Sequence, residues 1–134
     1  MALLRVVMIA VLLAAAGCGG SGDATDVRAL ASWAATTDMV AAAWTQHEVP
    51  RRYSLRAVGR ARQALTERGR HLDALPAAAR ARVGEALQRL DRAVAELAEA
   101  IERGDRTGAV PIRARLQAEA RTLGEVAAGL EARS

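Results

Sequence analysis

Few residues of this chain carry thiol or imidazole side chains, the groups that most often ligate haem iron and zinc. The 134 residues include one cysteine, Cys18, and two histidines, His47 and His71. A c-type haem needs Cys-x-x-Cys-His, which one cysteine cannot provide. A b-type haem needs Met and His at one level, but Met39 lies mid-helix and His71 near the far end of the next predicted helix. We expect no cofactor, no metal ligand and two exposed histidines near helix ends. A cryptic haem or metal-binding bundle is kept as an alternative that visible absorbance would reveal.

Groups for acid–base or nucleophilic catalysis are not brought together by the sequence pattern. Such chemistry needs paired groups in a pocket that excludes water. The serines are few, and the carboxylates are expected on solvated helix faces rather than among the apolar positions. We therefore predict that the protein is not an enzyme and has no catalytic residues.

The aromatic side chains are concentrated near one stretch of the chain. Trp33, Thr37, Val40 and Trp44 recur at steps of three and four, and Tyr53 follows beyond a turn. This spacing places the first four on one helix face. Two interpretations follow: the five residues line a flat pocket for a small apolar ligand, or the large side chains fill the core of an alanine-rich bundle. The core interpretation is favoured.

Positive charge is concentrated in residues 50–82, which hold nine arginines against two acidic residues, in a chain of net charge +4. Arg52, Arg56 and Arg60 form an i,i+4 stripe. One interpretation is a surface that meets anionic lipid headgroups or an acidic partner. The other is a solvated face partly neutralised by the preceding, acidic helix.

The remaining pattern predicts helices that position these residues. Thirty-three alanines, with leucine, arginine and glutamate, are typical of helices, and strand-like runs are absent. Pro50, Pro76 and Pro111 are interpreted as helix starts. The predicted helices cover residues 26–47, 50–70, 76–103 and 107–132. Short connections favour antiparallel neighbours, so we predict an all-α, antiparallel up-down-up-down four-helix bundle after a cleaved signal peptide.

The third predicted helix has the most regular pattern. Its apolar positions are Val83, Leu87, Leu90, Val94, Leu97 and Ile101. Its outer face carries three i,i+4 pairs of opposite charge, namely Glu85–Arg89, Arg92–Glu96 and Glu99–Arg103. At the following junction, Gly104 is expected to terminate the helix and Asp105 to act as a cap or turn residue.

The N-terminus has the pattern of an export signal. One arginine precedes the apolar run of residues 6–16, whose 11 residues are too few to span a bilayer. Ala15-Ala16-Gly17-Cys18 then resembles the lipobox of bacterial lipoproteins. That resemblance implies cleavage between Gly17 and Cys18 and attachment of a diacylglyceryl group to Cys18. Glycine rather than aspartate after the cysteine implies transfer to the outer membrane where the source has two membranes.

These observations together predict three segments and one class of protein. The segments are a signal peptide (1–17), a lipidated cysteine with a flexible tether (18–25) and a four-helix bundle (26–134). We expect an exported, membrane-anchored cell-envelope lipoprotein that faces the periplasm and acts as a structural or protein-interaction module. Its partners would be the membrane, through the lipid, and another envelope protein or a second copy. Nucleic acid is not expected, because the chain leaves the cytoplasm. The alternative is a carrier or sensor of small apolar ligands.

Overall fold

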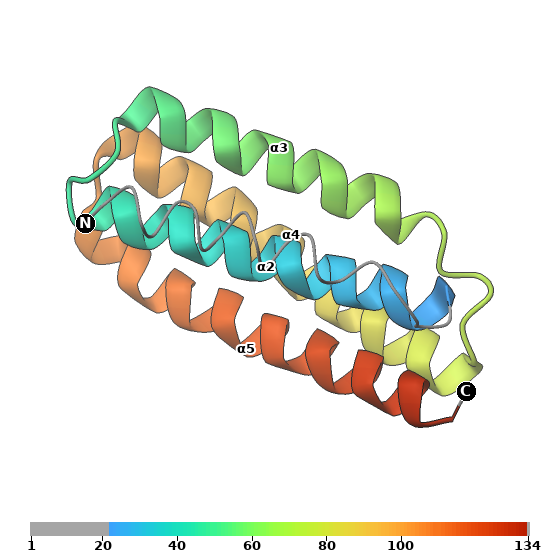
Figure 1. Ribbon diagram of the computed structural model, residues 1–134. Coiled ribbons are helices and arrows are strands. Elements are labelled where there is room, and N and C mark those ends of the chain that lie inside the picture. The colour runs from blue at the N-terminus through green and yellow to red at the C-terminus, as the bar shows by residue number, and fades with distance from the viewer. Residues whose placement is uncertain (1–21, 134) are drawn as a thin grey trace, which may run out of the picture.

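A computed structural model describes residues 22–133 of the chain. These residues form four α-helices that lie side by side in an elongated bundle (Figure 1), and no strand occurs among them. The helices are α2 (Gly22–Thr45), α3 (Arg51–Gly69), α4 (Ala77–Arg103) and α5 (Arg106–Ala132). The prediction of an all-α fold with four helices is confirmed.

Helix α2 differs most from its predicted bounds. It begins at Gly22, four residues before the expected start at Asp26, so residues 22–25 are helical although they were expected in the tether. Every other helix end lies within two residues of its expected position. Hydropathy and alanine content therefore located the helices well.

Each helix packs mainly against two neighbours around a shared core, and α2 and α4 also touch across it. α2 contacts α3 and α5, α4 contacts the same two helices, and the most extensive contact joins α2 to α5. Alanines 24, 34 and 41 of α2 are fully buried, and such small side chains let helix backbones approach closely. The largest fully buried side chains are Trp44, Leu30, Leu90, Leu97, Ile101, Leu116 and Leu123.

The turns after α2 and α4 use the same hydrogen-bonding motif. After α4, Gly104 has a φ of 69°, its N–H donates to the Ile101 carbonyl, and the Asp105 N–H donates to the Ala100 carbonyl. This is a Schellman motif, whose left-handed position favours glycine. The Asp105 side chain then caps α5 by accepting from the Gly108 N–H at 2.9 Å. Both expectations for this junction are confirmed.

After α2, His47 takes the position that Gly104 takes after α4. Its φ is 60°, its N–H donates to the Trp44 carbonyl, and the Glu48 N–H donates to the Ala43 carbonyl at 2.8 Å. A non-glycine residue in this left-handed conformation is strained because its Cβ approaches the backbone. The strain occurs at an exposed turn.

The three prolines do not all begin helices. Pro50 and Pro76 are the capping residues immediately before α3 and α4, as expected. Pro111 lies inside α5, so its interpretation as a helix start was wrong. The cap formed by Asp105 starts the helix at Arg106 instead. The missing N–H of Pro111 falls just beyond the first turn, where it removes one helical hydrogen bond.

None of the four helices combines the length and hydropathy that a bilayer-spanning segment requires.

Candidate functional site

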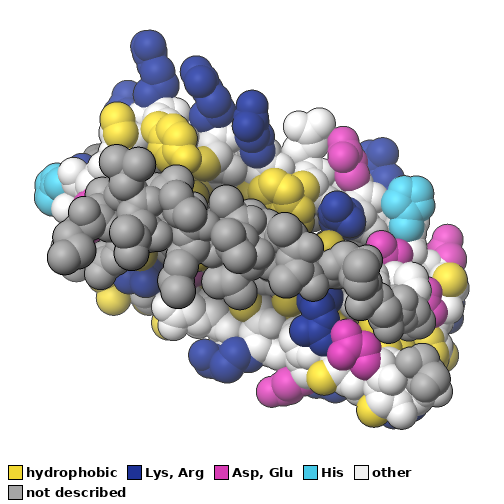
Figure 2. All heavy atoms as spheres, in the orientation of Figure 1, with side chains coloured by type: hydrophobic (Ala, Val, Ile, Leu, Met, Phe, Trp, Pro, Cys, Tyr) yellow, Lys and Arg dark blue, Asp and Glu magenta, His cyan; other side chains and the backbone are white. Residues whose placement is uncertain are grey.

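Helix α3 carries a charge unlike that of the other three helices. Its 19 residues contain six arginines and one glutamate. Helix α4 has five arginines and five acidic residues, and α2 has one arginine and three aspartates. Dark-blue arginine side chains accordingly project from the edge of the molecule that α3 forms (Figure 2). Positive charge is therefore concentrated on one helix.

Arg52, Arg56 and Arg60, the stripe recognised in the sequence, are exposed on α3. Among residues 22–133, none of the three has an ion-pair partner. Helix α3 forms its ion pair through a different arginine, Arg62, whose Nε lies 3.1 Å from Asp91 Oδ1 on α4. The stripe is consequently left with its full charge.

The acidic residues of α2 do not pair with this stripe. Asp38 accepts from Arg113 of α5 at 2.9 Å and from Gln117 of α5 at 3.1 Å. Arg28, the arginine of α2, lies 2.7 Å from Glu131 of α5. The ion pairs of α2 in the described part of the chain thus point to α5. The interpretation that α2 neutralises the stripe is therefore not supported by any ion pair among the described residues.

Tyr53 adds an aromatic side chain to the arginine stripe. Its exposed fraction is 56%, which makes it one of three large exposed apolar residues in the described range. At about 100° per residue, Tyr53 lies about 20° around α3 from Arg60. Gly59 on the same helix has open space where a side chain would stand. We call Arg52, Tyr53, Arg56 and Arg60 the α3 face.

The residues predicted to line an apolar ligand site are not brought together on one surface. Thr37 and Trp44 are each only 1% exposed and belong to the core, and the Thr37 hydroxyl donates to the Trp33 carbonyl at 2.8 Å. Trp33 and Val40 are half-buried and pack against that core, whereas Tyr53 points outward. Neither surface hollow described in the structure is lined by any of the five.

Trp44 is held by Arg106, which the sequence pattern did not single out. The Arg106 guanidinium lies 4.8 Å from the centroid of the indole ring, and its Nε donates to the Trp44 carbonyl at 3.2 Å. The arginine therefore covers the ring and satisfies a carbonyl at the end of α2. The indole Nε1 is buried without a hydrogen-bond partner.

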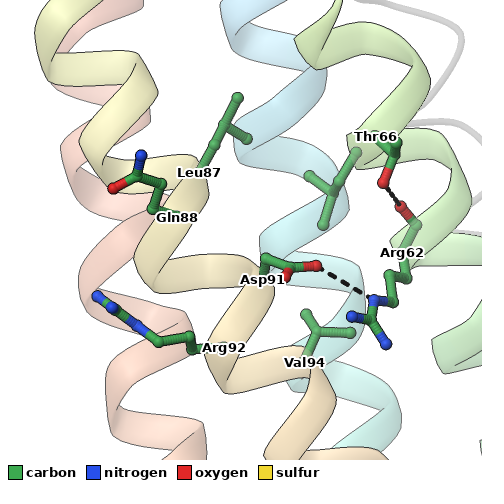
Figure 3. A pocket seen from close by; sticks show the side chains of 8 residues that line it. Arg62, Thr66, Leu87, Gln88, Asp91, Arg92 and Val94 are labelled. Atoms are coloured by element: carbon green, nitrogen blue, oxygen red, sulfur yellow. Dashed lines mark hydrogen bonds and ion pairs between the residues drawn. The ribbon is translucent and has the colours of Figure 1, made fainter.

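A groove of about 420 Å³ runs between α3 and α4 (Figure 3). Its apolar lining comes from Leu65, Leu87 and Val94. Arg62 of α3 and Asp91 of α4 point toward each other across it, joined by their ion pair. The polar residues that complete the lining are Thr66, Gln88 and Arg92. The volume lies in the range of small-molecule sites, although such sites are usually more enclosed and more apolar.

The expectation that carboxylates lie on solvated faces was wrong for Glu119. Its residue is 8% exposed, and it faces α4 from within α5. Oε1 accepts from Arg89 Nε at 2.7 Å, while Oε2 is buried with no hydrogen-bond partner. The hydrogen bond from Arg89 to Glu119, and then the charge of Glu119, raise the pKa of Arg89 above its ordinary value. The sequence signal was the spacing, because Glu119 lies between the apolar positions Leu116 and Leu123.

The three charge pairs expected along α4 form only in part. Arg103 and Glu99 pair at 3.8 Å. Arg89 instead pairs with Glu119, and Glu96 pairs with Arg115, both on α5. Partners on a neighbouring helix compete with partners one turn away. For Arg89, the attraction to Glu119 is screened less by water because the Glu119 side chain is only 10% exposed.

His47 and His71 are both exposed in the turns that precede and follow α3, as predicted. Cyan histidine side chains accordingly appear at the two ends of the molecule (Figure 2). Within residues 22–133, no group of three or more histidine, cysteine or acidic side chains is arranged to hold a metal ion.

No protein-family model matches the chain, and neither a curated protein nor a solved structure matches it. The predicted cleavage and lipidation residues, Gly17 and Cys18, lie outside the residues that the structure describes. Among the described residues, the α3 face is the candidate site that brings together exposed arginines without ion-pair partners.

Proposed function

We propose that this protein is a membrane-anchored cell-envelope lipoprotein whose helical domain is a non-catalytic interaction module. The observation that carries the proposal is Ala15-Ala16-Gly17-Cys18, whose two alanines end the apolar run of residues 6–16. Small residues give a peptidase access to the backbone, and the acyl chains on Cys18 would hold the domain at the membrane. Where the source has two membranes, Gly19 favours the outer one, with the domain in the periplasm.

The proposal includes an antiparallel, up-down-up-down order of the helices. The cross-helix ion pairs support it, because residue numbers rise on one helix as they fall on its neighbour. Arg28 and Asp38 of α2 pair with Glu131 and Arg113 of α5, respectively. In the same way Arg82, Arg89 and Glu96 of α4 pair with Glu125, Glu119 and Arg115 of α5. Such a domain presents rigid helix faces, of which the α3 face has the most unpaired charge.

The anchor is tested by the intact mass of the protein extracted from the membranes of a bacterium that matures lipoproteins. We expect the chain to begin at Cys18 and to carry two or three acyl chains. Native mass spectrometry of the same extract would also reveal a partner protein or a second copy.

Two variants control this measurement. Cys18→Ser is expected to keep residues 1–17 and to carry no acyl chain. Cys18→Ser/Ala35→Cys restores one thiol at an exposed position of α2 and is expected to stay unacylated as well. An unmodified wild-type N-terminus, or acylation of the relocated thiol, would contradict the proposal.

A further inference from the structure

The α3 face has the chemistry of a phosphate-binding surface. Arg52, Arg56 and Arg60 are exposed and have no ion-pair partner among residues 22–133, so their guanidinium groups are open to an external anion. A guanidinium group donates two parallel hydrogen bonds to phosphate oxygens, and it sheds water more readily than an ammonium group. Successive arginines rise by about 6 Å along the helix, so the three can contact separate phosphate groups at once.

Tyr53 suits the boundary between headgroups and acyl chains. Tyrosine is enriched at membrane–water interfaces because its ring is apolar and its hydroxyl group is polar. Here Tyr53 is 56% exposed and shares a helix face with Arg60, which lies two turns further along α3. Gly59, with open space at its Cβ position, lets a surface approach the helix backbone.

We propose that the α3 face binds the anionic phospholipid headgroups of the membrane that carries the anchor. This inference rests on the proposed function, because the lipid on Cys18 is what holds the domain at that membrane. Tyr53 is the α3 face's single large exposed apolar residue. Protein interfaces have an apolar centre surrounded by a polar rim, and the α3 face lacks such a centre. A charged lipid surface needs none, which favours lipid over an acidic protein.

The positions of Cys18 and of the α3 arginines define how the bundle would be oriented on the membrane. Helix α2 begins at one end of the bundle and α3 begins at the other (Figure 1). Cys18 precedes the first residue of α2 by only four positions. The lipid would therefore attach one end, and Arg52 and Arg56 near the start of α3 would attach the other. The long axis of the bundle would lie along the membrane.

The test uses the full chain with Cys18→Ser, so that no acyl group contributes. Co-sedimentation is measured with phosphatidylcholine vesicles and with vesicles of phosphatidylcholine and phosphatidylglycerol. The readout is the ratio of the two affinities, because the apolar run of residues 6–16 would bind both kinds of vesicle. At about 0.1 M salt, we expect clear preference for the anionic vesicles, which higher salt weakens.

Replacement of the three arginines tests whether vesicle binding depends on the α3 face or only on the net charge of the protein. Arg52→Gln/Arg56→Gln/Arg60→Gln is expected to lower the preference for anionic vesicles roughly a hundredfold, since each arginine near a membrane contributes about fivefold. The control variant Arg92→Gln/Arg121→Gln/Arg133→Gln removes the same charge from exposed positions outside α3. It is expected to lower the preference less than about tenfold. Circular dichroism checks that both variants keep their helices.

Three results would overturn the inference. The first is equal binding of the Cys18→Ser chain to both vesicle types. The second is an equal loss of preference in the two triple variants. The third is binding to poly-aspartate that depends on Arg52, Arg56 and Arg60 without a preference for anionic vesicles, which would indicate an acidic protein partner. The intact mass of the extracted protein tests the lipid anchor independently. Lipidation of Cys18 and headgroup binding by the α3 face can therefore fail separately.

Discussion

At the scale of single residues, the pair Arg89–Glu119 is asymmetric. The Arg89 side chain is 45% exposed, whereas that of Glu119 is only 10% exposed. Glu119 also has one oxygen, Oε2, that is buried without a partner. The loss of its partner would therefore destabilise one charged side chain more than the other. Arg89 alone can be hydrated, whereas Glu119 alone would be a buried, unpaired carboxylate.

This asymmetry predicts unequal effects of the two deletions on the free energy of unfolding. Arg89→Leu is expected to lower it clearly more than Glu119→Leu does, because the buried carboxylate of Glu119 loses its hydrogen bond. Glu119→Leu is expected to change it by less than about 1 kcal/mol, since leucine extends the apolar positions of α5 and Arg89 regains water. Urea denaturation of both variants measures the difference. Equal losses would mean that the pair is symmetric and that Glu119 has its own stabilising role.

At the scale of helices, the turns after α2 and α4 share a motif but not a residue type. Gly104 occupies the left-handed position after α4, and His47 occupies it after α2. The histidine is exposed, so its side chain gains little packing there. Among the described residues, the His47 side chain has no hydrogen bond, ion pair or ring contact that would offset the backbone strain.

His47→Gly is therefore expected to raise the free energy of unfolding by about 0.5 to 1 kcal/mol, because glycine adopts positive φ without a steric penalty. The matched change Gly104→Ala should lower it by about 1 kcal/mol. Thermal unfolding followed by circular dichroism measures both effects. A destabilised His47→Gly variant would show instead that the imidazole makes a contact that holds the turn.

At the scale of the whole molecule, α3 is the helix least integrated into the core. Its buried residues are only Ser54, Val58, Ala61 and Leu65, whereas nine residues of α4 are buried. The groove that Leu87 helps to line lies along the contact between α3 and α4. Fewer buried apolar contacts mean a smaller free-energy cost of local opening.

Amide hydrogen exchange is accordingly expected to be fastest in α3 among the four helices. The slowest exchange should occur in the middle of α4 and α5, around Leu97 and Leu116, which are fully buried. Anionic vesicles should slow exchange in α3 selectively if its arginines bind them. Uniform protection across the four helices would contradict the view that α3 is peripheral.

The amino-acid sequence by itself determined the helices and most of the core. Helical periodicity is local, so the spacing of Val83, Leu90 and Leu97 identified buried positions that the structure confirms. The roles of Gly104 as helix terminator and Asp105 as cap could be predicted for the same reason, because a cap depends on residues within one turn. The exposed arginine stripe of α3 also followed from i,i+4 spacing alone.

Tertiary structure decided which charged groups meet and which remain free. Arg89 pairs with Glu119 rather than Glu85, because α5 brings a buried carboxylate within 2.7 Å. One of the two interpretations of the arginine stripe placed the acidic residues of α2 beside α3, yet Asp38 pairs with α5. The helix pattern predicts which side of a helix is apolar, but not which neighbour faces each polar residue. That choice depends on the packing of all four helices, and it leaves Arg52, Arg56 and Arg60 of α3 without an ion-pair partner among the described residues.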